Sequence, residues 1–68
     1  MKYYVMEVAT ADGAEARAVT PYDELDNAVM AFHQVMASAY ANSAVTHALC
    51  VIINSKGGVE RSEALERE

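Results

Sequence analysis

The stretch Asn27–Ser55 reads NAVMAFHQVMASAYANSAVTHALCVIINS and contains no Asp, Glu, Lys or Arg, whereas the rest of the 68-residue chain carries all 15 of these residues. Its first half has the periodicity of an amphipathic helix, and its second half has the β-branched content of a buried strand. A chain of this length buries only about 60% of its unfolded surface when it folds alone. We therefore expect self-association or a protein partner to cover part of this stretch.

The helix is expected over about residues 23–42. Asp23 suits the N-cap position, and Asp26 adds a negative charge to the first turn, where the helix dipole favours it. Apolar residues at spacings of three and four form the predicted core stripe. This stripe consists of Leu25, Ala28, Val29, Phe32, Val35, Met36, Ala39 and Tyr40. The opposite face consists of Asn27, Met30, Gln34, Ala37, Ser38 and Ala41. Because a solvated helix normally carries Glu and Lys there, this neutral face indicates a packing surface.

Four strands are expected, over residues 2–9, 15–20, 45–54 and 59–65. Alternation in the first strand predicts Tyr4, Met6 and Val8 on the core face, with Tyr3, Val5 and Glu7 on the other. The second strand presents the small residues Ala16, Ala18 and Thr20 toward the helix, which would let the helix sit close to the sheet. The third strand is apolar on both faces, which is typical of a central strand.

The connections predict how these elements assemble. Asp12-Gly13 is a hairpin signal, Pro21 should end the second strand, and residues 54–58 form a turn. A right-handed crossover through the helix then gives an α+β fold of ββαββ type, a four-stranded antiparallel sheet in the order 2-1-3-4. One helix covers one face only. We expect the other face, carrying Tyr3 and Val5, and the neutral helix face to form a homodimer or higher oligomer.

Composition excludes several classes of function. A net charge of -5 and a pI near 4.8 argue against direct binding to nucleic acid and to acidic membranes. Polar residues interrupt the charge-free stretch too often for a membrane span. The single Cys cannot form an intramolecular disulfide, so a cytoplasmic protein is expected. We expect residues 66–68 to fray.

No residue pattern indicates catalysis, a metal or a cofactor. Cys50 lies in an apolar strand, where a thiol usually serves as a small core residue. His47 is three residues away and should point to the opposite sheet face, and His33 has no close Cys or His partner. We therefore predict that the chain is not an enzyme, with no catalytic residues, no metal ligands and no cofactor.

Two polar sets remain as candidate binding residues. An acidic surface for a basic partner protein would comprise Asp23, Glu24, Asp26, Glu60, Glu63 and Glu66, although capping and solvation explain each of them as well. A small-ligand site would use Arg17, Tyr40 and Lys56. Lys56-Gly57-Gly58 is also compatible with an anion-binding nest, but a hairpin turn is the simpler interpretation.

Three segments carry a resemblance to a group of proteins: Lys2–Glu7, Tyr22–Ala28 followed by Ala31–His33, and Val45–Thr46 leading into Leu49–Ile52. They are similar to small bacterial proteins associated with phages and mobile elements of gut Firmicutes. The shared residues are structural, so the resemblance implies a context and transfers no site residue. Proteins of this size from such elements are often binders or inhibitors of host systems.

Two hypotheses about function follow. The first is a non-enzymatic acidic interaction protein, oligomeric, that binds a host protein as a phage or mobile-element counter-defence inhibitor. The alternative is an oligomer that binds or sequesters a small ligand such as a nucleotide signal. Partners are therefore a second copy of the chain together with a host protein or a small molecule.

Overall fold

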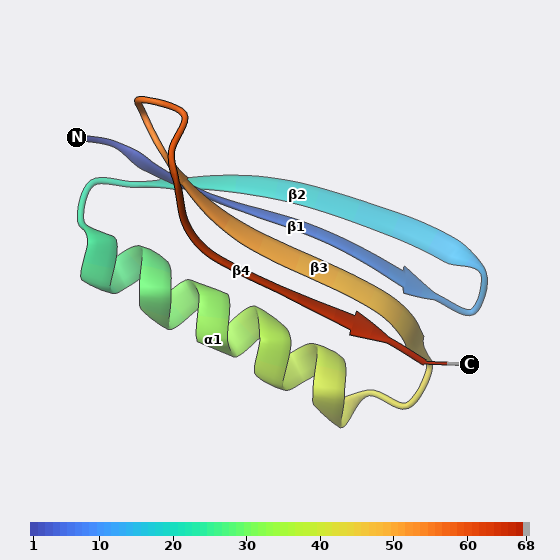
Figure 1. Ribbon diagram of the computed structural model, residues 1–68. Coiled ribbons are helices and arrows are strands. Elements are labelled where there is room, and N and C mark those ends of the chain that lie inside the picture. Colours follow the sequence, from blue (N-terminus) through green and yellow to red (C-terminus); the bar gives the residue numbers. More distant parts are fainter. Residues whose placement is uncertain (68) are drawn as a thin grey trace.

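The computed structural model describes residues 1–67. The elements are β1 (Tyr3–Ala11), β2 (Ala14–Tyr22), α1 (Leu25–Ala41), β3 (Val45–Asn54) and β4 (Val59–Glu66). The strands form one antiparallel sheet in the order β2-β1-β3-β4, and α1 lies along one face of it (Figure 1). The predicted α+β fold and its strand order are confirmed.

The β1–β2 hairpin turns at Asp12 and Gly13, whose φ angles are 52° and 79°. Two successive positive φ angles match the right-handed twist of the flanking strands, and Gly adopts this conformation without steric strain. Pro21 does not end β2 as predicted, because the strand continues to Tyr22. β2 is an edge strand, and an edge strand tolerates a residue that lacks a backbone N–H.

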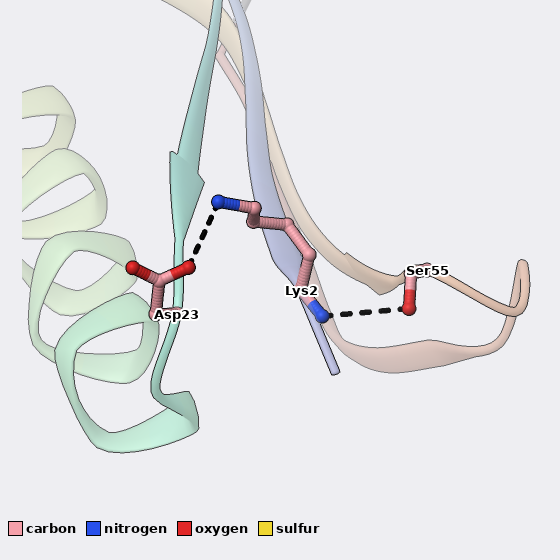
Figure 2. A network of polar contacts seen from close by, with 3 residues as sticks. All are labelled: Lys2, Asp23 and Ser55. Carbon is pink, nitrogen blue, oxygen red and sulfur yellow. Dashed lines mark hydrogen bonds and ion pairs between the residues drawn. The ribbon is translucent and has the colours of Figure 1, made fainter.

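The start of α1 differs from the prediction. Glu24 occupies the N-cap position and makes no side-chain capping hydrogen bond. The predicted cap, Asp23, instead accepts a hydrogen bond from Lys2 Nζ at 2.8 Å (Figure 2). This hydrogen bond and the charge of Asp23 raise the pKa of Lys2, and Lys2 lowers the pKa of Asp23 for the same reasons. The backbone N–H of Ser55 also donates to the Lys2 carbonyl, so Lys2 links the start of α1 to the β3–β4 turn.

The core lies between α1 and the middle of the sheet. Its buried residues are Val5, Ala28, Phe32, Met36, Ala39, Val45, Ala48, Cys50, Ile52 and Leu65. Four of the eight residues in the predicted stripe are buried and three are half-buried, but Tyr40 is exposed.

The first strand packs with the opposite face from the one predicted. Val5 is 3% exposed beneath α1, whereas its neighbour Met6 is 39% exposed on the far side of the sheet. Both alternating sets of β1 are apolar, so the sequence pattern does not distinguish them. Pairing decides the outcome, because Val5 lies opposite Ile52, which is fully buried under the helix.

The end of the described chain is anchored, contrary to the predicted fraying. Glu66 belongs to β4, and the backbone N–H of Arg67 donates to the Thr46 carbonyl at 2.7 Å. The Arg67 guanidinium donates to the carbonyls of Tyr40 and Asn42 at 2.8 Å and of Val45 at 3.1 Å. A basic side chain at a helix C-terminus satisfies carbonyls that have no partner within the helix. Residue 68, included in the same prediction, lies outside the described residues.

Candidate functional site: an open apolar sheet face

The sheet face turned away from α1 is covered by no other element of residues 1–67 (Figure 1). Its large apolar side chains are Tyr4, Met6, Val19, Leu49 and Val59, which are exposed, and Val8, Val51 and Ile53, which are half-buried. A soluble chain rarely leaves so many large apolar side chains together on one surface unless the surface binds something. This open sheet face is the strongest candidate for a functional site.

The strand register places these side chains in rows across the sheet. Met6 lies between Val19 on β2 and Val51 on β3, and Ser62 on β4 completes this central row, so three of its four side chains are apolar. In the next row Val8 lies between Arg17 and Leu49. The row nearest the β1–β2 turn is polar and comprises Glu15, Thr10, His47 and Glu66. The open sheet face therefore has an apolar centre and a polar margin at one end.

Two predicted interface residues do not belong to this face. Val5 is buried in the core, and Tyr3 is half-buried and packs against it, so the prediction that they line the open face is wrong. Residues missed by the prediction, Tyr4 and Met6 above all, take their place. The signal in the sequence was the apolar content of both alternating sets, which indicates a strand with a second apolar face.

The predicted neutral helix face is solvent-exposed. Asn27, Met30, Gln34, Ala37, Ser38 and Ala41 are all exposed. Met30, at 61% exposure, is the only large apolar side chain among them. This face is therefore small and mixed in character, whereas the open sheet face presents several large apolar groups.

A groove of about 450 Å³ runs between α1 and the β2 side of the sheet. Its lining includes Glu7, Ala9 and Thr20 from the sheet and Val35 and Ser38 from the helix. The helix packs mainly on β1 and β3, so the small residues of β2 stay exposed and do not draw the helix close as predicted. The groove therefore combines apolar walls with a half-buried carboxylate and several uncharged polar groups.

The six predicted acidic residues do not form one surface. Asp23, Glu24 and Asp26 lie where β2 leads into α1, whereas Glu60, Glu63 and Glu66 lie on β4, the opposite edge strand. Two of the six have partners of their own, because Asp23 pairs with Lys2 and Glu60 accepts a hydrogen bond from the Asn54 amide at 2.8 Å. The negative charge is therefore divided between two edges of the sheet.

The predicted ligand residues are not brought together. Arg17 lies opposite Val8 along β2 and pairs with Glu15, while Lys56 lies in the turn after β3, beyond the start of β1. Tyr40 is on the last turn of α1, on the other side of the sheet.

In the turn after β3, the neutral amide oxygen of Asn54 takes the place that an anion would occupy in a nest. The backbone N–H groups of Lys56 and Gly58 both donate to Asn54 Oδ1, at 2.9 Å and 3.0 Å. The nest that these groups could offer to an external anion is therefore filled by Asn54.

Cys50 is a core residue. Its side chain is fully buried on the helix side, and burial raises the pKa of the Cys50 thiol to about 11, with the charge of Glu7 acting in the same direction. His47 pairs with Thr10 on the open side of the sheet, so the two residues face apart as predicted. Among residues 1–67, no three His, Cys, Asp or Glu side chains are grouped as metal ligands.

This environment predicts slow reaction of Cys50 with thiol reagents. A pKa of about 11 in place of 9.0 reduces the thiolate fraction at pH 8 about 100-fold, and the thiolate is the nucleophile. We expect Ellman's reagent to react with the native protein at least about 100-fold more slowly than with protein unfolded in guanidinium. Rates within about tenfold of each other would contradict the buried placement.

No helix within residues 1–67 has both the length and the apolar character needed to span a bilayer. The sequence matches no family model, and searches of the curated proteins and of the solved structures gave no match.

Proposed function

We propose that this chain is a non-enzymatic, acidic interaction protein that assembles with itself and binds a second protein of its host. Its resemblance to phage and mobile-element proteins suggests a cytoplasmic inhibitor of a host defence system. The observation that carries the self-association is the open sheet face, whose central rows contain Met6, Val8, Val19, Leu49 and Val51, and the net charge of -5 supports the second, basic partner.

The total exposed surface does not by itself distinguish a monomer from an incomplete assembly. The chain exposes 4487 Å². A monomer of its mass, 7.4 kDa, is expected to expose about 4,200 Å². The difference is small, so the argument depends on the kind of surface that is exposed and on its grouping, not on the total area. A sheet with one helix on one side has only one of its two apolar faces buried.

The charge favours a basic partner protein. A net charge of -5 attracts positively charged surfaces and accelerates encounter with them at low salt. Because the acidic residues lie at two edges of the sheet, they are suited to steering a partner and not to forming a single concentrated contact.

The groove supports the second candidate function, small-ligand binding. It has the size of a small-molecule site, and Glu7 and Ser38 offer polar contacts within apolar walls. Its carboxylate favours a ligand with hydrogen-bond donors or positive charge over a phosphate-rich nucleotide. The Arg17, Tyr40 and Lys56 set proposed for a nucleotide signal does not line it.

Native mass spectrometry of protein purified from its own host, followed by denaturing analysis, tests the proposal. We expect a defined oligomer carrying a stoichiometric host protein. An oligomer with a small-molecule adduct would favour the ligand function instead. A bare monomer at all concentrations would contradict both.

A further inference from the structure

We propose that the open sheet face binds the same face of a second copy, giving a two-layer sandwich with the helices on the outside. This inference rests on the self-association in the proposed function and adds its surface and its geometry. It assigns the homodimer interface to the open sheet face, which includes Tyr4, Met6 and Leu49, and not to the exposed face of α1.

The size of the face suits a small homodimer. Its four strands are 9, 9, 10 and 8 residues long. At about 4.8 Å between strands and 3.3 Å per residue, the whole face, including its polar end row, covers roughly 500 Å² in projection. Two copies would thus bury about 1,000 Å² or more, the lower bound for a specific interface. The helix face has one large apolar side chain, Met30, and provides much less apolar area.

The chemistry of the face suits a second sheet. A sheet surface is broad and evenly spaced, and two such surfaces pack about 10 Å apart with interdigitating side chains. The central row of Val19, Met6, Val51 and Ser62 contains no charge, so its burial leaves no ion without a partner, and Arg17 in the next row pairs with Glu15. A basic host protein would find no carboxylate in this row to pair with. The same row of a second copy would offer apolar side chains for it to pack against.

The charged end row indicates how the two copies are related. A two-fold axis parallel to the strands would place β2 over β4, bringing Glu15 of one copy against Glu66 of the other. A two-fold axis across the strands would instead place the polar end rows at opposite ends of the interface. The second arrangement keeps Glu66 away from Glu15, whose charge Arg17 of the same strand partly offsets, so the preference for it is modest.

Two methionines provide a matched test. Met6 lies at the centre of the open sheet face and Met30 on the exposed face of α1. In sedimentation at micromolar concentration we expect the wild type to be a dimer. Met6→Glu should raise the dimer dissociation constant at least about 100-fold, since it would bury a charge in the interface. Met30→Glu should leave the dissociation constant within about threefold.

The outcomes separate this inference from the proposed function. Dissociation by Met30→Glu alone would overturn the sheet-face dimer and leave the oligomeric interaction protein standing. A monomeric wild type would overturn both. Circular dichroism of each variant establishes that its chain is folded.

A measurement on the wild type covers the case in which Met6→Glu does not fold. Hydrogen peroxide oxidises accessible methionine to the sulfoxide, and peptide mass spectrometry reports each site separately. Met6 should oxidise at least about fivefold more slowly in concentrated than in dilute protein, while the rate at Met30 stays constant. An equal dependence on concentration at the two sites, or none at Met6, would overturn the inference.

Discussion

Replacing Phe32 with Ala is expected to lower the free energy of unfolding by about 3–5 kcal/mol. Phe32 is 3% exposed at the centre of the core, and it is the only Phe in the chain. Its removal loses apolar burial and leaves a cavity between α1 and the sheet. A domain of this size is stable by roughly 3–10 kcal/mol in total, so the variant should be close to unfolded at room temperature.

His33→Ala is the matched control for Phe32→Ala. His33 is the next residue on the same helix and is exposed, and its ring lies nearly perpendicular to that of Phe32 at a centroid distance of 5.6 Å. We expect a loss of about 0.5 kcal/mol or less for this control. Urea titrations at one protein concentration measure both variants, because self-association would add to the apparent stability. Equal losses would contradict the placement of the core.

Val5→Glu is expected to abolish folding, whereas Met6→Glu at the adjacent position should leave a folded chain. Val5 points into the closed side of the sheet opposite Ile52 and is 3% exposed at the inner wall of the groove, so a carboxylate there would lose most of its hydration. Burying an unpaired charge removes more stability than a small domain possesses, roughly 4 kcal/mol or more. Met6 faces the open side, where the new carboxylate of a monomer stays hydrated.

Glu7 shows why the position of the charge matters. It points to the same side of β1 as Val5 but lies two residues further along, where the groove beside α1 keeps it half-exposed. Circular dichroism and thermal unfolding of the two Glu variants measure the difference. A folded Val5→Glu protein together with an unfolded Met6→Glu protein would mean that the helix covers the other face.

Local pattern was sufficient for the elements and their order. The spacing of Phe32 and Met36 in a helix without charges after Asp26, the Asp12-Gly13 turn and the β-branched run through Ile52 are all determined by neighbours in the chain. The right-handed β2–α1–β3 crossover then predicted the strand order β2-β1-β3-β4, and the structure confirms it.

Local sequence pattern predicted the residues of the candidate site less accurately than it predicted the helix and strands. The sequence indicated an uncovered apolar surface but placed Tyr3 and Val5 on it, because β1 is apolar on both sides. The hydrogen bonds of Arg67 could not be predicted from the sequence either, since the carbonyls of Tyr40 and Asn42 to which its guanidinium donates are 27 and 25 residues away.

Residue types and their spacing thus determine which segments become helix and strand, since those preferences depend on local contacts. Three features depend instead on contacts between distant segments: the side of β1 that lies under α1, the groove that opens beside β2, and the anchoring of Arg67. They follow from strand pairing, which places Val5 opposite Ile52, and from helix packing, which places α1 over β1 and β3. The same packing leaves Met6 and Leu49 on a face that one copy of this chain does not cover.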